Sequence, residues 1–185
     1  MFNLSISSDV KEFEELLKVP FGGWLIKNHH GGHVAVKDNE NSASAELFRT
    51  LRTNIRFMYP KNVKNPIILV TSSINSEGKS YVATNLAISM ALLGKKVALV
   101  GLDIRKPMLA NYLNLPTHGC LTSYLADEAY NVDDTIVHSF IDNLDVLPAG
   151  VVPPNPSELL QGERLDELFV ELRKRYDCIV VDSAP

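Results

Sequence analysis

Apolar residues follow two patterns that alternate from residue 66 onward. Mostly apolar runs of about four to eight residues are typical of buried parallel strands, and apolar side chains at every third or fourth position are typical of helices. The runs predict strands at residues 67–71, 96–102, 144–147 and 178–181. The helical periodicity predicts helices at residues 79–93, 121–125 and 161–176. This alternation predicts an α/β fold of right-handed βαβ units, with a mostly parallel sheet flanked by helices.

The part of the chain before residue 66 carries weaker patterns. An apolar stripe over residues 45–58 predicts a helix that Pro60 closes. A shorter helix is expected between Asp9, which can cap it, and Pro20. Residues 19–43 are rich in Gly, His, Asn and Ser, which is typical of a linker, and residues 33–36 are a candidate short strand. We therefore expect a linker with a short helix over residues 1–43 and an ATP-binding domain over residues 44–185.

The loop between the first strand and the next helix reads Ser-Ser-Ile-Asn-Ser-Glu-Gly-Lys-Ser over residues 72–80. Gly78 lets the backbone approach a phosphate, Lys79 would neutralise the β- and γ-phosphates, and Ser80 would offer its hydroxyl to Mg²⁺. The pattern predicts a P-loop ATP site, although Ser73 stands where the full pattern begins with glycine. The predicted nucleotide contacts are Asn75, Ser76, Glu77, Gly78, Lys79, Ser80 and Tyr81.

Carboxylates follow two of the predicted strands. Asp103 comes after the strand at residues 96–102, and Asp182 comes after the strand at residues 178–181. An aspartate in such a place commonly forms a turn, but phosphoryl transfer also needs carboxylates near Mg²⁺ at strand ends beside the phosphate loop. We expect Asp182 to hold Mg²⁺ through water. Asp103 is expected to polarise an attacking hydroxyl or to contact the metal directly. The candidate catalytic residues are Lys79, Asp103 and Asp182, and the candidate metal ligands are Ser80, Asp103 and Asp182.

Composition narrows the class of protein. The 185 residues are 45% hydrophobic and 22% charged, which is ordinary for a soluble domain. A net charge of −4 argues against a nucleic-acid partner. Cys120 and Cys178 lie far apart in the sequence without metal spacing, and reduced thiols are expected. Because the sequence stops just after a strand, we expect the C-terminal strands of the sheet to be missing.

Five segments, taken in order, resemble the bacterial tyrosine kinase family, the cytoplasmic domains of polysaccharide co-polymerases. They are Glu46-Leu47-Phe48-Arg49-Thr50-Leu51-Arg52, Ser76-Glu77-Gly78-Lys79-Ser80, Leu102-Asp103-Ile104-Arg105-Lys106-Pro107, Pro153-Pro154-Asn155-Pro156-Ser157-Glu158 and Val180-Val181-Asp182-Ser183-Ala184-Pro185. The resemblance covers most of the chain from about residue 40. It implies a MinD/ParA-like P-loop ATPase fold and transfer of the γ-phosphoryl group of ATP to protein tyrosines, in control of capsule and exopolysaccharide synthesis.

The resemblance also implies roles for particular residues. Lys79 and Ser80 would form the first nucleotide motif, Asp103 would be the second acid of an Asp-x-Asp motif, and Asp182 would be the last acid. Gly101 stands where the first acid of that Asp-x-Asp motif is usual. The helix that carries Glu46, Arg49 and Arg52 matches the family's ring-forming contact between neighbouring kinase domains.

The implied partners are further copies of the chain in a ring, a membrane-spanning co-polymerase segment or adaptor, and a tyrosine phosphatase. No nucleic acid is expected. The implied location is the cytoplasmic face of the bacterial inner membrane.

Two other functions fit the same loop. A partitioning or division-site ATPase would hydrolyse ATP to dimerise on DNA or membrane, but such proteins carry a lysine where Ile74 stands here. A non-catalytic module would sense the nucleotide and set assembly, and the glycine at position 101 favours that reading. Detection of phosphate on tyrosine separates the kinase from both.

Overall fold

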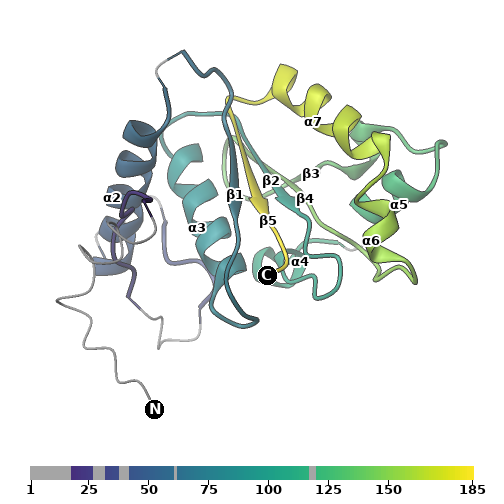
Figure 1. Ribbon diagram of the computed structural model, residues 1–185. Helices are drawn as coiled ribbons and strands as arrows, with labels where there is room; N and C mark the ends of the chain where they lie inside the picture. Colours follow the sequence, from purple (N-terminus) through teal and green to yellow (C-terminus); the bar gives the residue numbers. More distant parts are fainter. Residues whose placement is uncertain (1–17, 27–31, 38–41, 61, 117–119) are drawn as a thin grey trace.

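Five strands form one sheet in the order β1-β5-β2-β4-β3 (Figure 1). The structure is a computed structural model that describes residues 18–26, 32–37, 42–60, 62–116 and 120–185. The strands are β1 (Ile67–Val70), β2 (Val97–Gly101), β3 (Val137–His138), β4 (Leu144–Leu147) and β5 (Cys178–Asp182). Four of them are parallel, and β3 runs antiparallel to β4. The predicted mostly parallel α/β sheet is confirmed. The two residues of β3 are too few to show a period in the sequence.

Helices cover both faces of this sheet (Figure 1). One layer holds α2 (Ala43–Met58), α3 (Lys79–Ala91) and the short α4 (Leu109–Leu113). The other holds α5 (Leu121–Ala126), α6 (Pro156–Leu159), α7 (Glu163–Arg175) and a 3-10 turn, η1 (Val132–Thr135). The helices expected at residues 45–58, 79–93, 121–125 and 161–176 are therefore present, with ends that differ by up to two residues. The helix expected between Asp9 and Pro20 falls mostly outside the described residues.

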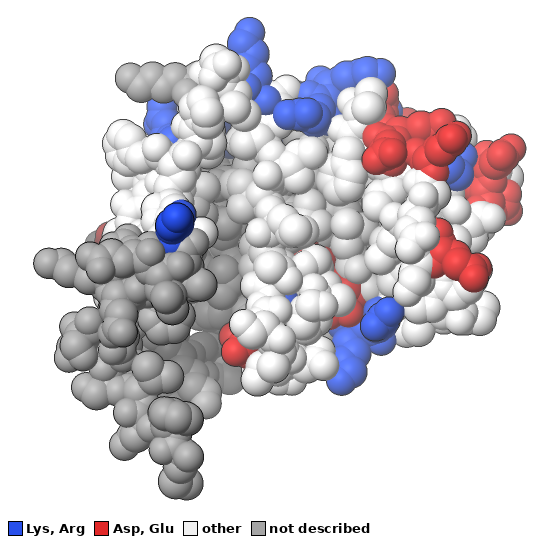
Figure 2. All heavy atoms as spheres, viewed as in Figure 1, with Lys and Arg blue, Asp and Glu red and all other residues white. Residues whose placement is uncertain are grey.

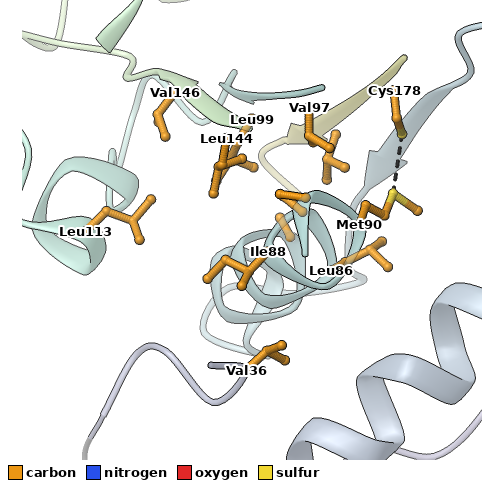
Figure 3. Close-up of a cluster of buried hydrophobic side chains, with 14 of the residues drawn as sticks. Val36, Leu86, Ile88, Met90, Val97, Leu99, Leu113, Leu144, Val146 and Cys178 are labelled. Atoms are coloured by element: carbon orange, nitrogen blue, oxygen red, sulfur yellow. Dashed lines mark hydrogen bonds between the residues drawn. The ribbon is translucent and has the colours of Figure 1, made fainter. Parts of the chain in front are cut away.

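Helix α3 lies at the centre of the larger core. Of its 13 residues only Tyr81 and Val82 are not buried, since the sheet covers one side and α2 covers another. Figure 3 shows Leu86, Ile88 and Met90 among side chains from the sheet. The Sγ atom of Cys178 lies 3.4 Å from the Sδ atom of Met90, and both cysteines are free thiols, as expected. A helix held on several sides gives the phosphate loop before it a rigid base.

Residues 32–37 do not form the strand expected at residues 33–36, and that expectation was wrong. The segment docks on α3 through one side-chain amide instead of a neighbouring strand. The Oδ1 atom of Asn85 accepts hydrogen bonds from the backbone N–H groups of Ala35 (2.6 Å) and Val36 (3.1 Å), and its Nδ2 atom donates to the carbonyl of His33 (2.9 Å). The amide provides the pairing that the sequence pattern attributed to a strand.

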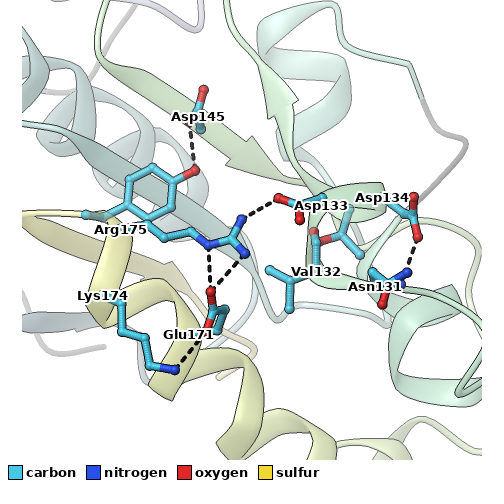
Figure 4. A network of polar contacts seen from close by, with 10 residues as sticks. Asn131, Val132, Asp133, Asp134, Asp145, Glu171, Lys174 and Arg175 are labelled. Atoms are coloured by element: carbon cyan, nitrogen blue, oxygen red, sulfur yellow. Dashed lines mark hydrogen bonds and ion pairs between the residues drawn. The ribbon is translucent and has the colours of Figure 1, made fainter.

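The far end of the sheet is tied to α7 by a polar network (Figure 4). Arg175 forms an ion pair with Glu171 at 2.8 Å and another with Asp133 of η1. The hydroxyl of Tyr176 donates to Asp145 of β4 at 2.7 Å. No helix in the described ranges combines the length and the apolar character needed to cross a bilayer.

Candidate functional site

The phosphate-type loop lies at the carboxyl end of β1 and ends at the first residue of α3. Gly78 caps α3 with φ +93°, a left-handed conformation in which a side chain would be strained. Ser73 is absent from the described residues with positive φ, so a side chain is tolerated where glycine is usual. The carboxylate of Glu77 accepts hydrogen bonds from the backbone N–H groups of Ser73 (3.0 Å) and Ile74 (3.2 Å). The Glu77 side chain therefore fixes the first half of the loop.

The fold brings the predicted lysine, serine and aspartates to this loop. Lys79 and Ser80 form the first turn of α3 and are buried, with exposed fractions of 7% and 9%. The carbonyl of Asp182 accepts hydrogen bonds from the backbone N–H groups of Leu102 (2.8 Å) and Asp103 (3.0 Å), which joins the ends of β5 and β2. A further bond from Ser183 N–H to the carbonyl of Val70 (3.1 Å) joins β5 to β1, where the loop begins.

Asp182 is the most unusual group of the site. Its side chain is almost wholly buried, and its Oδ1 atom has no hydrogen-bond partner in the described structure. Burial raises the pKa of Asp182 to about 6; a hydrogen bond from Ser80 and the charge of Lys79 oppose this shift, and the charge of Asp103 adds to it. A buried carboxylate oxygen without a partner fits a cation better than an empty protein interior.

Asp103 forms the kind of turn that an aspartate commonly makes after a strand. Its Oδ1 atom accepts a hydrogen bond from the backbone N–H of Lys106 at 3.0 Å, which closes a turn. The residue is nevertheless 7% exposed and lies beside Asp182. Asp103 therefore serves the turn and the site together.

In the described part of the chain, no group of three or more His, Cys, Asp or Glu side chains is placed so that it could hold a metal ion by itself. Mg²⁺ in nucleotide sites commonly uses one or two carboxylates together with phosphate oxygens and water. The donor set of Ser80 and Asp182, with Asp103 nearby, fits that mode of binding.

Tyr81, which was predicted to contact the nucleotide, packs against α2. The ring of Tyr81 packs edge to face against Phe48 of α2, with ring centroids 5.7 Å apart.

In α2, Arg49 forms an ion pair with Glu46, whose side chain is 60% exposed. The guanidinium of Arg52 donates to the carbonyl of Ser89 in α3. Burial, with a smaller effect from Arg49, lowers the pKa of Arg52. The ring contact assigned to this triplet stays a prediction.

Two features near the site had no signal in the sequence. The ring of Tyr112 in α4 stacks on the ring of His33, with centroids 3.8 Å apart, and burial together with the charge of Asp182 raises the pKa of Tyr112. Helix α4 is too short to show helical periodicity. Arg105 donates to the hydroxyl of Ser157 at 3.1 Å, so two of the five characteristic segments meet beside the ends of the strands.

The missing first acid at position 101 has a local packing reason. A Cβ atom at Gly101 would lie 3.2 Å from the backbone nitrogen of Ala149 and 3.2 Å from Cδ1 of Leu109. Both contacts are tighter than usual, and the backbone nitrogen belongs to a buried residue whose close packing restricts its movement. The end of β2 therefore leaves little room for a side chain at position 101.

We expect Gly101→Ala to lower the free energy of unfolding by about 1 to 3 kcal/mol, because the added methyl group overpacks a close contact. Urea unfolding followed by circular dichroism measures the change. Gly32→Ala is the matched control, since a Cβ atom there meets nothing within 4 Å. Equal stability of the two variants would show that the sheet end accepts a side chain.

Residues 65–185 match a family of AAA domains. The chain is 36% identical over 154 residues to the tyrosine-protein kinase YwqD of Bacillus subtilis, a match that covers 83% of the chain and 64% of YwqD. The chain thus spans less than two thirds of that relative's length.

Solved structures show the same likeness. The chimerical protein CapA2B2 superposes with a TM-score of 0.83 at 32% identity, over 95% of this chain and 75% of that one. The septum site-determining protein MinD of Pyrococcus horikoshii, solved with Mg-ADP, gives a TM-score of 0.55 at 25% identity over 64% of this chain and 48% of that one.

Proposed function

Because the chain belongs to the AAA domain family and is similar to bacterial tyrosine-protein kinases, we propose that it binds ATP with Mg²⁺ and transfers the γ-phosphoryl group to protein tyrosines. The observation that carries the proposal is the buried, unpartnered Oδ1 atom of Asp182 beside Lys79 and Ser80. Burying a carboxylate oxygen without a hydrogen-bond partner costs free energy, unless the carboxylate binds a cation that also contacts a phosphate. The greater likeness to the kinase domain of the Escherichia coli tyrosine kinase ETK (TM-score 0.82) than to MinD (TM-score 0.55) supports a kinase over a division-site ATPase.

Each side chain has a role in this proposal. The backbone N–H groups of the loop and the ammonium of Lys79 stabilise negative charge on the phosphates, at the N-terminus of α3. Ser80 and Asp182 hold Mg²⁺. The bound ion neutralises part of the charge on the phosphate oxygens. The tyrosine oxygen forms a bond to the γ-phosphorus while the bond to the β–γ bridging oxygen breaks, and Asp103 accepts the phenolic proton as ADP leaves.

The wider biological role follows from the five characteristic segments. We propose that the protein acts at the cytoplasmic face of the bacterial inner membrane and regulates capsule or exopolysaccharide synthesis. Its proposed partners are a membrane-spanning co-polymerase segment or adaptor, a tyrosine phosphatase and further copies of the chain. Glu46, Arg49 and Arg52 are the proposed ring contact. The side chain of Glu46 is more exposed than that of Arg49.

Incubation with γ-labelled ATP and Mg²⁺, followed by separation of phosphoamino acids and free phosphate, tests the proposal. Label on tyrosine that increases with the concentration of the chain supports the kinase. Release of free phosphate without labelled protein would indicate the partitioning type of ATPase. ATP binding with neither product would indicate the nucleotide-sensing module. Either of the last two results overturns the proposed kinase activity.

A further inference from the structure

Two adjacent cationic residues follow β2, next to the proposed proton acceptor Asp103. Arg105 and Lys106 are exposed, and neither forms an ion pair within the ranges that the structure describes. The hydrogen bond from the N–H group of Lys106 to the Oδ1 atom of Asp103 closes the turn and keeps both residues beside that carboxylate. Figure 2 shows basic side chains near the lower edge of the molecule, the side on which β5 ends in Figure 1, apart from the acidic side chains over α7. Two positive charges at this edge are therefore available to a ligand.

The guanidinium of Arg105 is held by the segment that follows β4. Its Nη2 atom donates a hydrogen bond to the hydroxyl of Ser157 at 3.1 Å, which leaves its other N–H donors for a second partner. A guanidinium binds a carboxylate best, through two parallel hydrogen bonds. The carboxylate next to Ser157 does not fill this role, because Glu158 accepts a hydrogen bond from Asn155 at 2.7 Å. The complementary carboxylate is therefore expected on another molecule.

The order of the strands separates the two cations from the nucleotide loop. The loop follows β1, and β5 lies between β1 and β2 in the sheet. Arg105 and Lys106 follow β2, and Ser157 lies in the segment after β4, the next strand along. A nucleotide on the loop would therefore lie to one side of Asp103. The other side, over the ends of β2 and β4, is left for the acceptor.

Exposed apolar side chains accompany the cations at this edge. Val151 and Val152, in the segment after β4, are 77% and 51% exposed, and Met108, just before α4, is also exposed. Because β2 and β4 are parallel neighbours, the segments that follow them leave the sheet at the same edge. Exposed apolar groups beside charged ones mark interaction surfaces. We call Arg105, Lys106, Met108, Val151 and Val152 the β2–β4 surface.

We propose that the β2–β4 surface binds an acidic peptide segment, in which Asp or Glu residues flank a tyrosine and pair with Arg105 and Lys106. The proposal rests on the proposed phosphoryl transfer for its role, and it adds the class of acceptor. The bound segment presents its tyrosine hydroxyl to Asp103, while the two cations offset the repulsion between the segment and the carboxylates of the site. The net charge of the chain is −4, so an acidic peptide gains nothing from non-specific attraction.

Fluorescence anisotropy tests the binding step without catalysis. The probe is a labelled peptide with glutamates on both sides of a single tyrosine, in the presence of Mg²⁺ and a non-hydrolysable ATP analogue. Arg105→Glu with Lys106→Glu is expected to raise its Kd at least about tenfold, because two attractive charge pairs become repulsive. Lys95→Glu with Lys96→Glu is the matched control, since it makes the same change of charge at the opposite end of β2. Screening by salt should keep its effect within about twofold. An equal effect of the two double variants would overturn the proposal.

Labelling kinetics give the second readout. The glutamate peptide is compared with the same peptide carrying glutamine, and the original chain is expected to show a KM at least about fivefold lower for the glutamate peptide at a similar kcat. Arg105→Gln with Lys106→Gln should remove that difference and leave the KM for ATP unchanged. A raised KM for ATP with an unchanged KM for the peptide would show that the cations hold phosphates instead, and would overturn the proposal.

The two readouts separate this proposal from the proposed kinase activity. Equal labelling of the glutamate and glutamine peptides would overturn the acidic preference and leave the kinase activity standing. Binding of the glutamate peptide that depends on Arg105 and Lys106, without labelled tyrosine, would overturn the kinase activity and leave the recognition of acidic segments standing.

Discussion

Lys79→Met is expected to reduce phosphoryl transfer by at least about a hundredfold, because removal of one positioned charge-stabilising group commonly costs a factor of that size. Lys79 is 7% exposed at the first turn of α3, and methionine has a similar length and an apolar character. The variant should therefore keep the fold of the loop while losing the ammonium group. The initial rate of tyrosine labelling, measured at saturating Mg²⁺ and ATP, reports the loss.

Lys95→Met is the matched control for this substitution, because it removes an exposed lysine from the turn after α3. It is expected to label tyrosine at the original rate. A Lys79→Met variant that folds and retains more than about a tenth of the original rate would show that the ammonium group does not stabilise the transferred phosphoryl group.

Asp182→Asn is expected to stabilise the nucleotide-free protein while removing its activity. The pKa of Asp182 is about 6 in the folded state against 3.8 for an unperturbed aspartate, so the charged form is disfavoured by folding. Above pH 6 the native carboxylate thus costs on the order of 2 to 3 kcal/mol, and asparagine removes that cost. As the pH falls through about 6 the native group takes up a proton. The advantage of asparagine should therefore be full at pH 8 and should disappear by pH 4.

Urea unfolding of the original chain and of Asp182→Asn at pH 8, 6 and 4 measures this dependence. Asp142→Asn provides the control, because Asp142 is an exposed residue in a turn. The titratable and polar groups near Asp182 are Lys79, Ser80, Asp103 and Tyr112, and all four remain in the variant. A stability gain that does not change with pH, or a loss at pH 8, would contradict the electrostatic origin given to the buried carboxylate.

Long elements and strong motifs were accessible from the sequence. The apolar runs of β2 and β5 are buried throughout, as such runs predict, whereas β1 lies at the edge of the sheet and its residues alternate between exposed and half-buried. The expected resemblance to bacterial tyrosine kinases is confirmed by the relatives and by the superposed structures. The meeting of Lys79, Asp103 and Asp182 followed from parallel topology alone, since carboxyl ends of parallel strands share one edge.

Features that depend on tertiary contacts were not accessible. The segment at residues 33–36 has the composition of a strand, yet it pairs with the Asn85 side chain and not with a backbone. The packing around Gly101 depends on Leu109 and Ala149, which lie on other elements of the chain. Arg52 belongs to a helical stripe in the sequence, and its bond to Ser89 appears only when α2 lies on α3. Sequence periodicity carries no information about such partners.

A crystal structure of the chain with Mn²⁺ and a non-hydrolysable ATP analogue tests the proposed site most directly, since Mn²⁺ replaces Mg²⁺ and is located by its anomalous scattering. The expected result is a triphosphate on the loop at residues 72–80, with the Mn²⁺ peak beside the Ser80 hydroxyl and the Asp182 carboxylate. A metal peak away from both residues, or a nucleotide bound elsewhere on the chain, would contradict the proposed site.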